Sequence, residues 1–251
     1  MSGHSKWASI KHKKGAADAK RGKIFTKLIR EITVAAREGG GNPEANPRLR
    51  FAIQQAKDAN MPADNIERGV KKGTGELEGV SYESISFEGY APGGVAVIVE
   101  VLTDNKNRTT SEVRSIFTKR GGNMAGAGSV VFQFEKKGTF LVNKENVDEE
   151  ELLTIALDAG AEDLTSDEEF YQITCACKDF DKVRTGLINR KIKIESGELS
   201  MVPKSTIRVG DPVTAKKILD LVEDMEDNDD VQNVYTNFDI PDEILNAIEE
   251  E

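Results

Sequence analysis

Positively charged side chains are concentrated in the first thirty residues of this 251-residue chain, where they could bind phosphate groups. The segment contains nine Lys and Arg residues and one acid, Asp18, so its net charge is +8, whereas the whole chain carries −10. A basic segment on an acidic body is typical of proteins that bind a polyanion. Lysine contacts phosphate as a point charge, and Trp7 and His12 could stack on unpaired bases. The predicted nucleic-acid-binding residues are Lys6, Trp7, Lys11, His12, Lys13, Lys14, Lys20, Arg21, Lys23, Lys27 and Arg30.

The basic segment also fits kinds of region that bind no nucleic acid. A solvated helix face or a solubility tail has the same composition, and charge patches are weak evidence by themselves. A mitochondrial presequence would be rich in Arg and Ser, whereas this segment is rich in Lys. A secretory signal is not expected, because no apolar run follows the charges, and no stretch is long and apolar enough to predict a membrane span.

The side chains that usually carry catalysis are sparse, and we predict no enzymatic activity, cofactor, metal site or small-molecule substrate. The only histidines, His4 and His12, lie in the basic segment and offer no zinc-ligand spacing. Cys175 and Cys177 are two residues apart on a predicted strand, a geometry unsuited to a disulfide, so a reduced, cytoplasmic compartment is expected. An enzyme that uses a cleft between domains remains the alternative of another class.

Loops that could hold phosphate or a cation also lack the required spacing. Gly22-Lys23 has no Walker-type glycine at the right distance, and the Gly121 to Gly128 loop contains no lysine. Asp227, Asp229 and Asp230 lack the glycine and terminal Glu of a calcium loop, so they are predicted to form a solvated acidic turn.

A second polar cluster lies at residues 103–109, between a predicted buried strand and the start of a helix. The free amides of a helix N-terminus favour an anion. The residues predicted as a secondary anion or RNA contact are Asp104, Asn105, Asn107 and Arg108. Simple helix capping and turn formation explain the same residue types.

Three helices are predicted in the first domain, residues 1–80. The first, Ala16 to Glu38, has apolar residues at the helical period opposite its Lys and Arg residues, and Ser5 to Gly15 is expected to be an arm that orders on binding. The second begins at Asn46-Pro47, and the third runs from Ala63 to Lys72 and ends at Gly73.

Short strands and helices are predicted in the remainder of the chain. Strands are expected at 84–88, 95–102, 130–134, 139–143, 169–177, 192–202, 206–209 and 231–238, and helices at 109–120, 148–159, 179–190 and 212–225. The first of these helices is predicted to start with a Thr109/Glu112 capping box. The predicted fold class is α+β: a three-helix domain followed by two small α/β sandwich domains of ferredoxin-like type, one inserted in the other.

The domain boundaries follow from counting elements. Residues 81–135 lack the second helix of a sandwich, so the helix and strand within 204–240 are predicted to return to complete it. Residues 136–203 would then be an inserted βαβαβ domain, and 241–251 an acidic C-terminal tail.

Several long motifs resemble those of the YebC family. They are Gly3 to Lys14 (GHSKWASIKHKK), Met61 to Arg68 (MPADNIER), Gly93 to Thr109 (GGVAVIVEVLTDNKNRT) and Gly121 to Asn123 (GGN). The resemblance implies a helical domain followed by two α+β domains. It also implies a DNA-binding transcriptional regulator, with mitochondrial members described as translational activators, of cytochrome oxidase, and a ribosome-associated role proposed for bacterial ones. Two departures are Gly69, expected to loosen the third helix, and Ala125 to Ala127, which replace a more polar loop.

The physics of recognition leaves two forms of this function open. A protein that recognises a specific sequence in duplex DNA presents Arg, Asn or Gln to base edges in the major groove, whereas the first helix offers mostly Lys. No helix-turn-helix dimer signature is present, so the sequence is compatible with a monomer. The expected partner is therefore nucleic acid, either DNA or ribosomal RNA and the ribosome.

Overall fold

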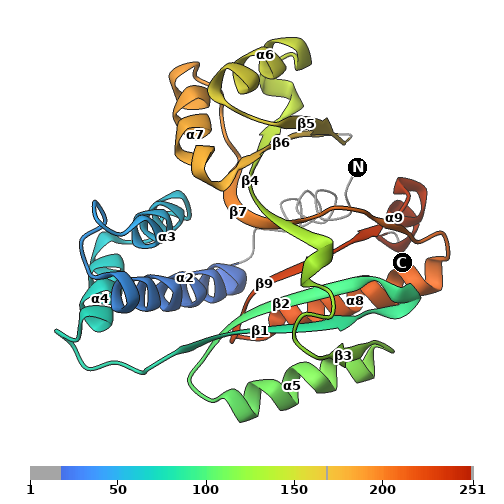
Figure 1. Ribbon diagram of the computed structural model, residues 1–251, viewed down its shortest axis with the longest axis horizontal. Coiled ribbons are helices and arrows are strands. Elements are labelled where there is room, and N and C mark those ends of the chain that lie inside the picture. The colour runs from blue at the N-terminus through green and yellow to red at the C-terminus, as the bar shows by residue number, and fades with distance from the viewer. Residues whose placement is uncertain (1–17, 168, 250–251) are drawn as a thin grey trace.

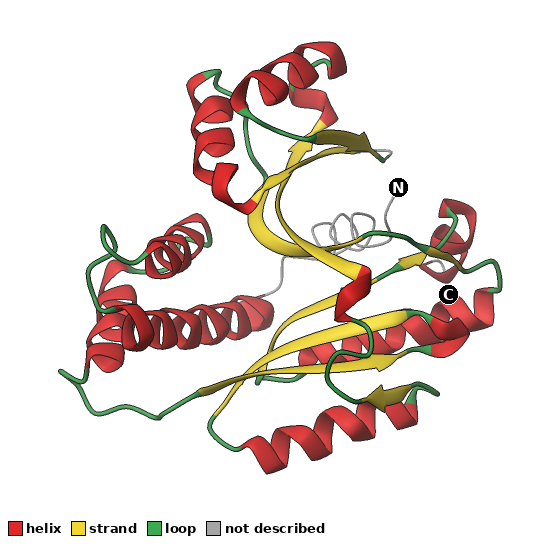
Figure 2. Cartoon of the chain, viewed as in Figure 1, coloured by secondary structure: helices red, strands yellow, loops and turns green. Residues whose placement is uncertain are grey.

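The computed structural model describes residues 18–167 and 169–249. They form a helical region followed by two antiparallel sheets, each with helices on one face (Figures 1 and 2). This is the predicted α+β class. In the described ranges, no helix has the length and hydrophobicity to cross a membrane.

The helical region consists of α2 (Asp18–Gly39), α3 (Pro47–Asp58) and α4 (Ala63–Thr74). Asn46 caps α3 by accepting a hydrogen bond from the Leu49 amide at 3.0 Å, and Pro47 starts the helix. The apolar faces meet in one core that includes Ile32 and Leu49. α4 ends later than predicted, because Gly75 and not Gly73 adopts the left-handed conformation that stops the helix (φ 82°).

The two glycines inside α4 allow it to lie close to α2. A Cβ atom on Gly69 would lie 3.1 Å from Ile32 Cγ2, and one on Gly73 would lie 2.4 Å from the carbonyl oxygen of Thr33. The Thr33 hydroxyl also donates a hydrogen bond to the Gly69 carbonyl at 3.2 Å. Gly69 therefore permits tight packing of α4 on α2, and the expectation that it loosens the helix stays a prediction.

Gly73→Ala is expected to lower the free energy of unfolding by about 1–3 kcal/mol, because the new methyl group must push back a backbone carbonyl. Urea denaturation measures the change. Gly22→Ala in α2 is the matched control, since its Cβ atom would meet nothing within 4 Å. Equal stabilities of the two variants would contradict the close α2–α4 packing.

The first sheet contains β1 (Glu83–Tyr90), β2 (Ala96–Thr103), β3 (Asn123–Ala125) and β9 (Val231–Thr236), in the order β3-β1-β2-β9. Helices α5 (Lys106–Lys119) and α8 (Pro212–Asp227) cover one face. Ala96 and Ile98 on the other face pack against Val130 and Phe134. β2 is buried on both faces, which explains its nearly continuous apolar sequence.

The second sheet contains β4 (Phe134–Asn143), β5 (Asp163–Ser166), β6 (Phe170–Ala176) and β7 (Ser196–Pro203), in the order β5-β6-β4-β7. Helices α6 (Glu149–Ala159) and α7 (Phe180–Asn189) pack on it. The prediction lacked β5, because this short strand has no apolar alternation. With β5 the unit is βαββαβ and has the ferredoxin-like strand order. The chain leaves the first sheet before β4 and returns to it at β9, so the second sheet is inserted.

Several predicted boundaries were wrong for identifiable reasons. α5 begins at Lys106 because Asn105 caps it, and Thr109 is buried inside the helix instead of capping it. The predicted strand 130–134 is instead a 3-10 turn at Val131–Gln133, held by the buried carboxylate of Glu88, which accepts hydrogen bonds from three backbone amides. Burial opposes ionisation of this carboxyl, but these amides lower its pKa.

The remaining elements are short. β8 (Ile207–Arg208) pairs in parallel with β10 (Phe238–Asp239). Helix α9 (Asp242–Glu249) lies in the segment predicted as an acidic tail, and its Leu245 is buried in the core of the first sheet. Cys175 is buried, which raises its pKa to about 11, whereas Cys177 begins a 3-10 turn after β6 and is exposed. Further 3-10 turns span Pro92–Gly94 and Lys144–Asn146.

Candidate nucleic-acid interface

The predicted nucleic-acid-binding residues fall into two groups. Lys6, Trp7, Lys11, His12, Lys13 and Lys14 lie outside the described residues. Lys20 and Arg21 fall in the first turn of α2, and Lys23, Lys27 and Arg30 follow along the same helix.

The cations of α2 contact an acidic segment some two hundred residues later in the chain. We call residues 226–230 (Glu-Asp-Asn-Asp-Asp), between the last turn of α8 and β9, the acidic turn. Lys23 Nζ lies 3.0 Å from Asp227 Oδ1, and Lys27 Nζ donates to the Glu226 carbonyl at 2.8 Å. Arg30 Nη1 donates to Asp230 Oδ1 at 2.8 Å and to the Asp229 carbonyl at 2.6 Å. In this arrangement the acidic turn covers part of the predicted basic face.

These contacts differ in strength because they differ in burial. The Lys23–Asp227 pair is exposed, so solvent screens it and its contribution is about 0–1 kcal/mol. The Asp230 side chain is only 4% exposed and that of Arg30 16%, so their attraction is screened far less. The Arg30 guanidinium also lies 5.3 Å from the centre of the Tyr82 ring, a cation–π contact. Arg30 is therefore the main anchor between α2 and the first sheet.

Asp230 is the centre of a hydrogen-bonded cluster. Besides Arg30, its carboxylate accepts hydrogen bonds from Arg108 Nη2 at 2.6 Å, Thr109 Oγ1 at 2.6 Å and Thr103 Oγ1 at 3.1 Å. Burial opposes ionisation of Asp230, but the hydrogen bonds from Thr109, Arg108, Arg30 and Thr103 outweigh it and lower its pKa. The prediction of a solvated acidic turn is wrong at this residue, because one carboxylate joins α2, α5 and the acidic turn.

The second predicted contact, residues 104–108, lies at the start of α5. The Asn105 side chain caps the helix by accepting from the Arg108 amide at 3.1 Å. The Arg108 guanidinium donates to Asp104 at 2.9 Å as well as to Asp230. Asn107 is exposed, and its carbonyl accepts from Ser111. Capping and ion pairing thus engage Asp104, Asn105 and Arg108 in this structure.

The helical region is also joined to the second sheet. Arg50 pairs with Asp181 at 3.2 Å, and Arg184 pairs with Asp58 at 3.0 Å. The Phe51 ring meets the Phe180 ring edge-on, with 5.2 Å between centres. α3 therefore contacts α7, while α2 contacts the first sheet.

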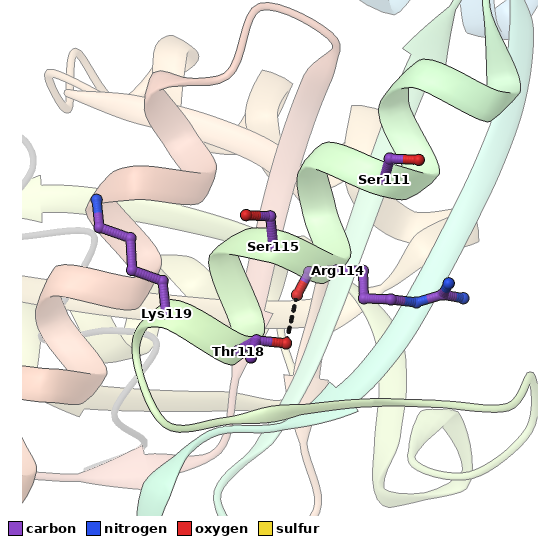
Figure 3. A pocket seen from close by; sticks show the side chains of 5 residues that line it. All are labelled: Ser111, Arg114, Ser115, Thr118 and Lys119. Atoms are coloured by element: carbon purple, nitrogen blue, oxygen red, sulfur yellow. Dashed lines mark hydrogen bonds between the residues drawn. The ribbon is translucent and has the colours of Figure 1, made fainter.

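The outer face of α5 carries a hollow that was not predicted from the sequence. This hollow of about 500 Å³ is lined by Ser111, Arg114, Ser115, Thr118 and Lys119 (Figure 3). The sequence did contain a sign of a cationic surface here, because the helix has four cations and one acid in a chain of net charge −10. Within the described ranges, no group of three or more His, Cys, Asp or Glu side chains could hold a metal ion.

Comparison with known proteins gives matches along most of the chain. Residues 5–76 match the TACO1/YebC protein N-terminal domain, and residues 82–238 match the TACO1/YebC second and third domain. Proteins named probable transcriptional regulatory protein are similar over 99% of the chain and 100% of their own length: 56% identical in Syntrophobacter fumaroxidans, 57% in Persephonella marina and 58% in Geobacter sulfurreducens. The crystal structure of a conserved hypothetical protein from Aquifex aeolicus is 53% identical, with a TM-score of 0.86, and covers 94% of this chain and 97% of its own.

Proposed function

Because the chain belongs to the TACO1/YebC family, we propose that it is a non-enzymatic regulator of gene expression that binds nucleic acid through its basic N-terminal segment. Whole-length similarity to proteins named probable transcriptional regulatory protein is the observation that carries this proposal. The net charge of +8 in the first thirty residues supports it, since such a segment is attracted to phosphate.

DNA-bound transcriptional control is the form that the relatives' names suggest. Binding to ribosomal RNA or the ribosome is the second form, and one observation favours it. Lys23, Lys27 and Arg30 contact the acidic turn, so this side of α2 could enter a major groove only after those contacts break. The predicted arm contains Trp7 and His12, side chains that suit unpaired bases.

A competition experiment tests the proposal and separates its two forms. The full-length protein is offered labelled duplex DNA, structured ribosomal RNA and intact ribosomes at near-physiological salt, and the salt dependence of each affinity is recorded. Duplex binding that survives salt and prefers particular sequences would support transcriptional control. Weak, steeply salt-dependent DNA binding beside tight ribosome binding would support translational control. Binding to none of the three would contradict the proposal.

A further inference from the structure

Helix α5 is cationic although the body of the protein is acidic. It carries Lys106, Arg108, Arg114 and Lys119 against a single acid, Glu112. The neighbouring helix α8 shows the reverse, with five acids and two lysines. A cationic helix on an acidic surface is either neutralised by ion pairs within the protein or available to an external anion.

Internal ion pairs account for only part of the charge on α5. Arg108 is engaged by Asp104 and Asp230, and Lys119 Nζ lies 3.7 Å from Asp224. Lys106 and Arg114 are exposed, and neither has a carboxylate partner among residues 18–167 and 169–249. These two side chains lie eight residues apart, about 12 Å along the helix axis. Two unneutralised cations at this spacing are available to phosphate groups.

The hydroxyl groups on the same helix add a second property. Ser111 and Thr118 donate their hydroxyl protons to the carbonyls of Asn107 and Arg114, both at 2.9 Å. Their oxygen atoms therefore remain as acceptors. A phosphate oxygen cannot donate a hydrogen bond to them, whereas the 2′-hydroxyl of ribose can. A ribose-phosphate chain offers both partners that this face requires.

The shape of the face allows such a chain to approach. Ser111, Ser115 and Thr118 have short side chains and line the hollow of about 500 Å³, and no acid is among the residues that line it. Figure 3 shows Arg114 and Lys119 extending to opposite sides of this row of hydroxyl-bearing residues. Anionic groups in the hollow would thus have Arg114 on one side and, on the other, the exposed Lys119, whose ion pair with Asp224 is long at 3.7 Å.

We propose that the outer face of α5 is a second binding surface of this protein and that it takes the ribose-phosphate backbone of RNA. The proposal rests on the proposed function and deepens it, because it names the class of nucleic acid. Among the described residues, the α5 surface meets α2 at the Asp230 cluster, and the basic N-terminal segment proposed to bind nucleic acid is a different part of the sequence. A bound RNA would therefore span two surfaces, with the α5 face adding contacts that position it.

The test compares Lys106→Ala/Arg114→Ala with Lys216→Ala/Lys217→Ala, which removes two exposed lysines from α8 and gives the same net charge. Each full-length variant is titrated with a structured ribosomal RNA and with DNA of the same sequence over a range of salt. For the α5 variant we expect RNA affinity to fall about tenfold and the salt slope to fall by about 1–2, since about one unit is lost per phosphate contact. The α8 variant is expected to bind as the wild type does.

A second variant examines the preference for ribose. Thr118→Val keeps the side-chain shape and removes the hydroxyl acceptor. We expect it to weaken RNA binding about threefold, within the range of one lost hydrogen bond, and to leave DNA binding unchanged. The proposal would be overturned by an unchanged salt slope in the Lys106/Arg114 variant, by an equal loss of affinity in the α8 variant, or by equal losses on RNA and DNA in Thr118→Val. Failure of the proposed function would give a different result from failure of this proposal, because the wild-type protein would then bind neither the RNA nor the DNA.

Discussion

Replacing Asp230 with alanine is expected to lower the free energy of unfolding by about 3–5 kcal/mol, because the change removes a buried carboxylate and leaves the partly buried Arg30 guanidinium without its charged partner. Asp230 accepts hydrogen bonds from Arg30, Arg108, Thr109 and Thr103, and its side chain is 4% exposed. After the substitution the Arg30 guanidinium keeps only carbonyl acceptors in the acidic turn and β2. The loss should therefore combine a broken cluster with weaker docking of α2.

Urea denaturation followed by circular dichroism measures this effect. Asp227→Ala is the matched control, since it removes a carboxylate of the same turn whose partner, Lys23, is exposed, and it should cost about 0–1 kcal/mol. Limited proteolysis adds an independent readout, because a released α2 is cut more readily. Asp230→Ala and Asp227→Ala variants of equal stability would contradict a central role for Asp230.

The pH dependence of stability should also depend on Asp230. Burial opposes its ionisation, but hydrogen bonds from Thr109, Arg108, Arg30 and Thr103 lower its pKa. Its contribution is therefore complete above the pKa of an unfolded Asp, about 3.9, and is lost as the pH falls through the folded-state value. The stability difference between the wild type and Asp230→Asn is expected to be constant from pH 7 to about 5 and to shrink below about pH 4. A difference that grows on acidification would contradict the lowered pKa.

Reversing the charges of the arm is expected to abolish nucleic-acid binding without changing the fold. The variant is Lys11→Glu/Lys13→Glu/Lys14→Glu, which turns three predicted phosphate contacts into three repulsive charges. Since about one unit of salt slope is lost with each phosphate contact, the slope should fall by about three, and affinity at near-physiological salt should fall by more than about a hundredfold. Electrophoretic mobility shift and thermal unfolding are the measurements.

Reversing the charges of α2 should have a different result. Lys23→Glu/Lys27→Glu places carboxylates against Asp227 and the Glu226 carbonyl, so the repulsion should weaken the docking of α2 and lower the melting temperature. Loss of binding in the arm variant at an unchanged melting temperature, beside a lowered melting temperature in the α2 variant, separates recognition from docking. Unchanged affinity in the arm variant would contradict the proposed function.

Much of the fold could be predicted from local patterns. Three patterns each indicate one element: the helical period of α2, the Asn46-Pro47 start of α3 and the apolar run of β2. Burial of one face gives a helical period, a capping residue before proline marks a helix start, and burial of both faces gives a continuous apolar run. Short elements without such a sequence pattern were not predicted. β5 is polar, and α9 was hidden within an acidic segment although its Leu245 is buried.

For the candidate interface, the sequence by itself determined that a strongly basic N-terminal segment is joined to an acidic body, because charge is a property of composition. The tertiary structure alone decided which of these charges face one another. Lys23, Lys27 and Arg30 lie about two hundred residues from the acidic turn, and they meet it because β9 pairs with β2 and thereby places Asp230, the residue before β9, beside α5. Such contacts depend on the order of strands in the sheet, which no local pattern records, and so the cationic face of α2 that was predicted to bind nucleic acid is partly covered by the protein itself.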